Sequence, residues 1–362
     1  MSRPTETLWE IERHTLAKHE ILRRYLGAWF AILGSKFSRI MYLDGFCGPG
    51  RYKGGEDGSP IIALQEAKKQ KNLKKKDVFF LFIDENQDRI RYLQTEIANF
   101  EIPNNFEVRI HEAQFHDTLS KLLDEIKKQG KQLMPTFAFI DPFGFKGIPF
   151  NLVERLLAVP STEVFINVML DSINRFVEHP DSNTQQHIID MFGTNEVLDV
   201  IKSGENRFAV LRFLYQEQLQ KHAKFVRFFE MRDYHNRIIY CLFFASNHPL
   251  GHVKMKETFW EIDPSSGFKF SDRTNPNQQV LFEIDPSNDL ADDLIKLFAS
   301  QTVQSEIVIK HVEDQTPYIA KHGRNALKKL EQGKKIIVNQ YKIDGKKRIR
   351  NTFPRGTVIK FS

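Results

Sequence analysis

The twelve residues Met41–Tyr52, which read MYLDGFCGPGRY, constrain the fold of this chain more than any other stretch. An apolar run ends in an acid, Asp44, and a turn rich in glycine follows. Glycine tolerates positive φ angles and lets backbone N–H groups approach a ligand closely. A buried strand that ends in an acid and opens into glycines is typical of nucleotide sites in doubly wound α/β domains. The alternative is an ordinary strand–turn whose glycines have no functional role.

This turn differs from a phosphate-binding loop. No GxxxxGK[ST] pattern follows the strand, and the acid precedes the glycines. That order favours a cationic ligand over a pyrophosphate. The candidate ligand contacts are Asp44, Gly45, Phe46, Cys47, Gly48 and Gly50.

Strand-like runs alternate with helical patterns through the first half of the chain, after a predicted helix over 7–33. The runs are Ile40–Leu43, Val78–Ile83, Phe106–Ile110, Thr136–Ile140 and Glu163–Leu170. Two further runs, Lys224–Met231 and Arg237–Ser246, are separated by a short polar connection that predicts an antiparallel hairpin. We therefore expect an α/β fold with a doubly wound, mostly parallel, seven-stranded sheet.

The polar stretch Asp285–Asp293 predicts a domain boundary, which divides the chain into residues 1–290 and 294–362. Beyond it the sequence predicts two helices, Val303–Val312 and Tyr318–Gln332, and then two strands, Ile336–Ile343 and Lys346–Arg350. Two helices followed by a basic β-ribbon are typical of a winged helix-turn-helix.

The positive charge of the chain lies in this C-terminal part. Residues 301–362 hold 14 Lys/Arg and 5 Asp/Glu, whereas residues 1–300 hold 38 and 41. A basic module favours a polyanionic partner, so we expect nucleic acid, DNA or RNA, to bind here. The candidate phosphate contacts are Lys321, Arg324, Lys328, Lys329, Lys346, Lys347, Arg348 and Arg350.

Polar residues also follow the second and third strands. Asp84 and Glu85 follow the second, where an acid can accept hydrogen bonds from both ribose hydroxyls; helix capping is the alternative. Gln114 follows the third strand, near the expected position of an adenine, although a solvated loop explains it equally well.

The fourth strand ends in Asp141, Pro142 and Phe143. An amino group can donate to the Asp141 carboxylate while an aromatic ring stacks on its plane, and Phe143 or Phe145 can supply that ring. The alternative is a tight turn built on Asp-Pro and glycine. Asn167, near the end of the fifth strand, either lines the same cleft or caps the next helix.

These motifs resemble the class I S-adenosylmethionine-dependent methyltransferases. The run Asp44–Gly50 is similar to their DxFxGxG loop, and Asp141-Pro142-Phe143 resembles the (D/N)PP(Y/F) motif of enzymes that methylate base amino groups. Here Phe143 replaces the second proline and Gly144 the aromatic residue. Lys18 resembles a lysine of some rRNA adenine N6-methyltransferases that meets the methionine carboxylate of the cofactor; a solvated helix face is the alternative.

The whole chain resembles the three-Cys-motif partner (TcmP) family, through HTLAKHEIL, LDGFCGPGRY, FAFIDPFGF and GHVKMKETFW. This resemblance implies an S-adenosylmethionine-dependent methyltransferase, encoded beside a three-cysteine protein of radical S-adenosylmethionine type. The altered motif after the fourth strand favours an alternative, a non-catalytic nucleic-acid-binding partner or regulator of that protein. A methyltransferase acting on protein is a third hypothesis.

Composition excludes several other classes. With two cysteines, Cys47 and Cys241, the chain has no disulfide framework and fits a reducing cytoplasm. The N-terminus lacks an apolar signal core, so we do not expect export. No run is long enough for a membrane helix, and no histidine spacing predicts a metal site.

Overall fold

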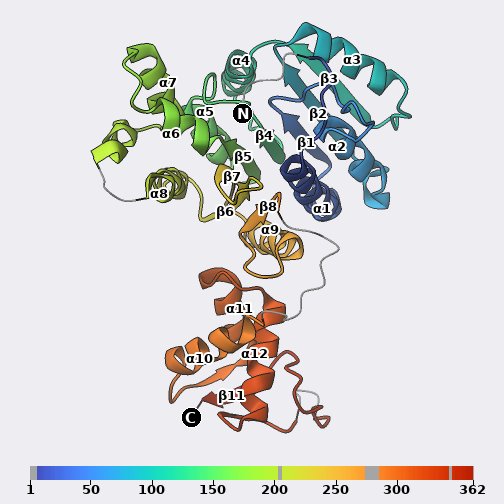
Figure 1. The fold of residues 1–362 in the computed structure, drawn as a ribbon. Coiled ribbons are helices and arrows are strands. Elements are labelled where there is room, and N and C mark those ends of the chain that lie inside the picture. Colours follow the sequence, from blue (N-terminus) through green and yellow to red (C-terminus); the bar gives the residue numbers. More distant parts are fainter. Residues whose placement is uncertain (1–5, 203–205, 274–284, 342–344, 362) are drawn as a thin grey trace. The chain divides into compact units, whose positions relative to one another are not determined.

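An eight-stranded sheet with the order β3-β2-β1-β4-β5-β7-β6-β8 dominates the first part of the chain (Figure 1). The computed structural model describes residues 6–202, 206–273, 285–341 and 345–361. Its strands are β1 (Arg39–Asp44), β2 (Asp77–Asp84), β3 (Phe106–Glu112), β4 (Thr136–Ile140), β5 (Thr162–Val168), β6 (Phe225–Arg232), β7 (Ile238–Ser246) and β8 (Lys269–Ser271).

The pairing confirms the predicted sheet and adds a strand to it. Strands β1 to β5 run parallel, and β7 pairs antiparallel with both β5 and β6, as the predicted hairpin requires. The additional strand is β8, which pairs parallel with β6. With three residues, β8 is too short to produce a periodic pattern, so the sequence-based prediction stopped at seven strands.

Helices cover both faces of the sheet. They are α1 (Arg13–Lys36), α2 (Ser59–Lys68), α3 (Gln87–Ala98), α4 (Phe115–Lys128), α5 (Phe150–Leu157), α6 (Leu170–Phe176), α7 (Ser182–Phe192), α8 (Arg207–Gln220) and α9 (Pro249–Ile262), together with the 3₁₀ turns Lys71–Leu73 and Asn195–Lys202. The first helix begins at Arg13 rather than at residue 7, and residues 6–12 before it are irregular.

Alternation along the strands builds two cores. Leu43, Ile140 and Ile166 face α4 and α5 within one aliphatic cluster. Phe137, three residues before Ile140, faces the other way: its ring centroid lies 5.3 Å from that of Tyr25, on α1. Because successive strand residues point to opposite faces and helices cover both, these strands read as continuous apolar runs.

The chain consists of two compact units. The sheet unit comprises Met1–Thr258 and Phe268–Pro276, and the C-terminal unit comprises Phe259–Gly267 and Asn277–Ser362. The division at 290 and 294 stays a prediction; α10 (Ser287–Leu297) crosses both positions.

The C-terminal unit has the helix and strand order of a winged helix. After α10 come β9 (Thr302–Gln304), α11 (Ser305–Gln315), α12 (Ala320–Gln332), β10 (Ile336–Val338) and β11 (Val358–Phe361). The three strands pair antiparallel in the order β10-β11-β9. Its core is formed by Leu290, Leu294, Val308, Val312, Leu327, Ile336 and Ile359.

One predicted strand of this unit is wrong. Lys346–Arg350 is irregular apart from a single bridge between Lys347 and Tyr341, and the strand that pairs with β10 is β11. The residues of β11, the central strand of this small sheet, alternate between exposed and buried, because successive side chains point to opposite faces and one face covers the core. Of the other predicted strand, Ile336–Ile343, the structure forms Ile336–Val338, and residues 342–344 lie outside the described part.

Among the described helices, none combines the length and apolar character needed to cross a lipid bilayer.

Candidate functional site

Asp44 lies buried at the carboxyl end of β1, with 0% of its surface exposed. Its Oδ1 accepts a hydrogen bond from the Phe46 backbone N–H at 3.3 Å, and its Oδ2 accepts one from the Tyr42 hydroxyl at 3.2 Å. The Ser59 hydroxyl, at the start of α2, donates a further bond. Burial nevertheless raises the pKa of Asp44 to about 7, because these donors do not replace water fully. A ligand cation would complete this site.

The glycine turn wraps over this acid and is tied to the neighbouring strand. Gly48 and Gly50 adopt φ angles of 60° and 83°, where other residues are strained. The Gly48 N–H donates to Asp84 Oδ2 at 3.1 Å, and the Asn86 N–H donates to Asp84 Oδ1 at 2.8 Å. Asp84 therefore fixes the turn, and each of its oxygens can still accept another bond.

Five other predicted cofactor contacts lie on this turn or on the neighbouring strand ends. Gly45 is buried against the Phe115 ring, and the rings of Phe46 and Phe115 are 5.4 Å apart. Cys47 is buried, and burial raises the pKa of its thiol, so it is a packing residue in this state. Glu85 and Gln114 are exposed, and their roles stay predictions.

Asp141 is held by two side chains from different elements. Lys18, on α1, donates to its Oδ2 at 2.5 Å, and Asn167, on β5, donates to its Oδ1 at 2.8 Å. Lys18 is 5% exposed, and its Nζ lies 5.3 Å from the centroid of the Tyr240 ring. The structure thus joins a predicted catalytic acid directly to a predicted cofactor contact. Asn167 therefore holds this acid and does not cap α6, whose N-cap position is Met169.

His19 lies beside this ion pair and is buried. Burial, and then the positive charge of Lys18, lower the pKa of its imidazole to about 3. His19 is therefore neutral at physiological pH and contributes a flat, uncharged surface next to Tyr52, with their ring centroids 5.6 Å apart.

Two residues that the sequence did not single out complete the site. Trp9 precedes α1 and packs edge-on against Tyr52 and Phe143, with centroid distances of 5.4 and 5.7 Å. The Arg89 guanidinium, from α3, lies 4.8 Å from the Trp9 ring centroid and 5.5 Å from that of Phe143. Sequence pattern held no signal for either residue, because Trp9 lies in an irregular segment and Arg89 in an ordinary helix.

The two phenylalanines in the loop after β4 have different surroundings. Phe143 is half-buried and faces Trp9 and Arg89, whereas Phe145 is buried with its ring centroid 5.9 Å from that of Phe176. Pro142 between Asp141 and Phe143 is buried. Of the two rings proposed for stacking, Phe143 is therefore the more accessible one.

No group of three or more His, Cys, Asp or Glu side chains within the described ranges is arranged to hold a metal ion.

The predicted nucleic-acid contacts divide into exposed and internal residues. Lys321, Arg324 and Lys328 are exposed on one side of α12, because residues three and four apart share a helix face. Lys346, Lys347 and Arg350 are exposed in the connection from β10 to β11, which we call the wing. Lys329 instead pairs with Asp285, with Nζ and Oδ2 2.6 Å apart.

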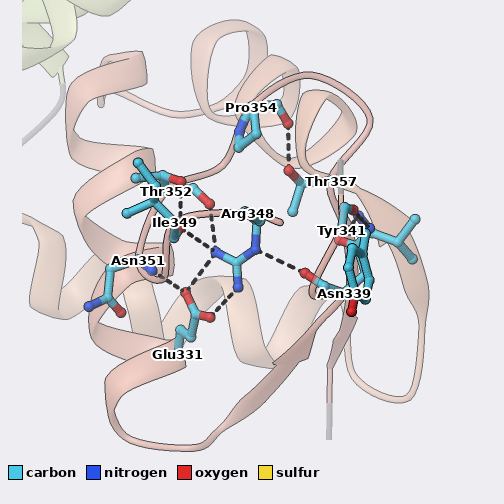
Figure 2. A network of polar contacts seen from close by, with 10 residues as sticks. Glu331, Asn339, Tyr341, Arg348, Ile349, Asn351, Thr352, Pro354 and Thr357 are labelled. Carbon is cyan, nitrogen blue, oxygen red and sulfur yellow. Dashed lines mark hydrogen bonds and ion pairs between the residues drawn. The ribbon is translucent and has the colours of Figure 1, made fainter. Parts of the chain in front are cut away.

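Arg348 has an internal role, in contrast to its predicted one. Figure 2 shows its guanidinium turned into the unit, where it forms a two-pronged ion pair with Glu331 of α12. Arg348 Nε also donates to the Asn339 carbonyl at 2.9 Å, and Nη1 donates to the Thr352 carbonyl at 2.7 Å. Its side chain is 5% exposed. Arg348 therefore anchors the wing to α12, and its charge is not available to phosphate.

We expect Arg348→Met to detach the wing from α12. Removing one partner of a buried ion pair leaves Glu331 charged and unpaired, which costs about 3–5 kcal/mol. Hydrogen exchange of the amides in 345–357 should accelerate by at least about 100-fold, since 1.4 kcal/mol corresponds to a factor of ten. Lys347→Met, at the exposed neighbouring position, is the control. Equal exchange in the two variants would contradict the anchoring role.

Strand order, hairpin and acid-to-glycine turn define the sheet unit as a methyltransferase-type α/β fold, and the C-terminal unit is a winged helix. A family model described as "GMT-like wHTH domain" matches residues 269–340, about a fifth of the chain. No curated protein matches the sequence.

Several solved structures are similar to this chain at low identity. A Legionella pneumophila protein of family DUF519 has 14% identity and a TM-score of 0.40, over 67% of this chain and 90% of its own. An O-methyltransferase from Bacillus cereus, in complex with SAH, has 14% identity and a TM-score of 0.35, over 62% and 80%. Human methyltransferase-like protein 13, also with SAH, has 9% identity and a TM-score of 0.36, over 78% and 100%. Likenesses this distant say nothing about the substrate of this chain.

Proposed function

We propose that the sheet unit binds S-adenosylmethionine and transfers its methyl group to a nucleic acid held by the C-terminal unit. The observation that carries the proposal is the buried Asp44, whose pKa is raised to about 7, at the end of β1 beneath the glycine turn. A buried acid of this kind gains most from a ligand that brings a positive charge, and the methionine ammonium group is such a ligand.

In this proposal each strand end has a distinct partner. Asp44 faces the ammonium group, Asp84 with Glu85 accepts hydrogen bonds from the ribose hydroxyls, and Gln114 lies by the adenine. The cofactor supplies a sulfonium-bound methyl group for displacement by the acceptor. The chain contributes positioning and exclusion of water. A base within a duplex must leave the stack to reach the cleft.

The ion pair between Lys18 and Asp141 gives these residues linked roles. If Lys18 turns to the carboxylate of the methionine group, Asp141 Oδ2 loses its positively charged partner. That oxygen can then accept a hydrogen bond from an acceptor amino group, while Asn167 keeps the other oxygen in place. Cofactor binding would thus prepare the acceptor site.

The surroundings of Asp141 and the residues that follow it also support a second function. Both Asp141 oxygens already accept hydrogen bonds, and the residues after it depart from the base-amino-methyltransferase motif. The resemblance to the three-Cys-motif partner family supports a non-catalytic nucleic-acid-binding partner of a three-cysteine protein. We also propose that this chain has two domains, a methyltransferase-like domain over residues 1–290 and a winged-helix domain over residues 294–362.

Calorimetry and methyl transfer separate these functions. We expect micromolar binding of S-adenosylmethionine and S-adenosylhomocysteine, and transfer of tritium from labelled cofactor to DNA, tRNA or rRNA. Binding without transfer to any of them would favour the non-catalytic partner, and transfer to protein alone would redirect the acceptor assignment. If the folded protein binds neither compound, the methyltransferase proposal is wrong.

A further inference from the structure

We propose that the Trp9 indole occupies the place of the acceptor's aromatic ring, and that Arg89 is a further residue of that acceptor site. The inference rests on the proposed function and deepens it. We call the place held by the indole, against both Phe143 and Arg89, the ring slot. Its ligand is a planar aromatic heterocycle, with a nucleobase as the probe.

The ring slot lies between the two loops that a transfer reaction must bring together. On one side, a Cβ built on Gly48 would lie 3.8 Å from Cη2 of Trp9, so the indole rests against the glycine turn. On the other side is Phe143, two residues after Asp141. A ring in this slot therefore adjoins both the cofactor turn and the acid proposed to hold the acceptor.

The walls of the slot suit any flat π system. Phe143 meets the indole at an interplanar angle of 74°, and the Arg89 guanidinium lies over the indole ring. Edge-to-face and cation–π contacts require a flat π face and no fixed pattern of hydrogen-bonding groups, and both indole and a nucleobase present such a face. Arg89 is 1% exposed, so these contacts form away from water, where they are strongest. A nucleobase can replace the indole with the same partners.

The segment that carries Trp9 can leave the slot without unfolding a regular element. Residues 6–12 precede α1, and the bond from the Lys53 N–H to the Trp9 carbonyl, at 3.0 Å, fixes their position beside the turn. Withdrawal of Trp9 therefore requires local rearrangement. The indole then acts as an internal competitor for the acceptor ring.

Fluorine NMR of the full chain labelled with 5-fluorotryptophan tests the inference directly. The three tryptophans give three signals, and Trp9→Phe assigns one; Trp29 and Trp260 are buried and serve as internal references. We expect adenosine or cytidine, at millimolar concentration with S-adenosylhomocysteine present, to move the Trp9 signal towards that of a solvated indole. The other two signals should remain in place.

Variants establish which residues form the slot. Ligand-observed NMR titrations of adenosine should show affinity about tenfold higher in Trp9→Ala, because the competitor is gone. Affinity should be about tenfold lower in Phe143→Leu and Arg89→Met, because one wall is lost. Arg91→Met, an exposed arginine on the same helix, is the matched control. If Arg89→Met fails to fold, the adenosine affinity of Phe143→Leu still tests whether the ring slot binds the nucleobase.

Three results would overturn the inference while leaving cofactor binding to be judged by calorimetry. The first is weaker adenosine binding in Trp9→Ala, which would make the indole a wall of the site. The second is a Trp9 signal that S-adenosylhomocysteine alone displaces fully, which would assign the slot to the adenine of the cofactor. The third is a Trp9 signal that no nucleoside or cofactor moves.

Discussion

Asp44→Asn is expected to weaken the binding of S-adenosylmethionine by at least about 100-fold while the protein stays folded. Asn keeps the shape of the side chain and an oxygen that can accept from Phe46 N–H. It removes the negative charge that the proposed site offers to the ammonium group. Truncating one partner of a buried charged pair costs about 2–5 kcal/mol, which corresponds to the expected loss of affinity.

The same substitution should change how stability depends on pH. The pKa of Asp44 is raised from 3.8 to about 7 in the folded state, so between these values the folded protein binds more protons than the unfolded chain. The contribution of Asp44 to the free energy of unfolding is therefore fully present below about pH 4 and is lost as the pH rises to 7. This difference between the two pKa values corresponds to a loss of stability on the order of 4 kcal/mol, which is absent in the Asn variant.

His19 makes stability change with pH in the opposite direction. Comparing wild type with Asp44→Asn cancels this effect. Because the pKa of its folded-state imidazole is lowered to about 3, stability from His19 increases as the pH rises from 3 towards 6.5. This contribution is the same in wild type and variant. Urea unfolding of both proteins between pH 4 and 8 therefore isolates the Asp44 effect as the difference between their unfolding free energies.

An exposed acid supplies the control for both measurements. Asp88→Asn, on α3, removes a carboxylate with 70% of its side chain exposed and should leave cofactor affinity and the pH dependence unchanged. Wild-type affinity in Asp44→Asn would contradict the assignment of Asp44 to the ammonium group. A pH-independent difference in stability would contradict the raised pKa.

Replacement of the three exposed cations of α12 should have the second large effect. The triple variant Lys321→Gln, Arg324→Gln, Lys328→Gln is expected to bind nucleic acid about 100-fold more weakly near 100 mM salt. Within the described residues these three side chains form no ion pair, so their charges are available to phosphate. The slope of log K against log salt should decrease by about 2–3, because each lost phosphate contact removes about 0.9.

The matched control variant loses the same net charge, but at positions elsewhere in the C-terminal unit. Lys296, Lys310 and Lys360 are exposed on α10, α11 and β11, and the corresponding triple Gln variant removes the same charge. Fluorescence anisotropy with a labelled duplex and a labelled single strand, each over a salt series, measures both variants. Equal losses in the two would show a diffuse attraction to net charge rather than an interface on α12.

The sequence predicted the sheet of this protein because its signals are local. Apolar runs such as Val78–Ile83 must be buried on both faces, and helical periodicity between them leaves a mostly parallel sheet as the solution. It also placed Asp44, Asp84 and Asp141 at strand ends. In a parallel sheet those ends meet at one edge, so their proximity follows from topology alone.

Only the tertiary structure decided how side chains far apart in sequence use that edge. The pairing of Lys18 with Asp141 joins α1 to β4, and the stacking of Arg89 joins α3 to a segment predicted to be helical. Arg348 shows the same principle in the C-terminal unit: its basic neighbours predict phosphate binding, yet Glu331 turns it inward. Local sequence determines secondary structure through periodicity. The direction of a long charged side chain depends on the partner that packing brings near, and no sequence pattern records that partner.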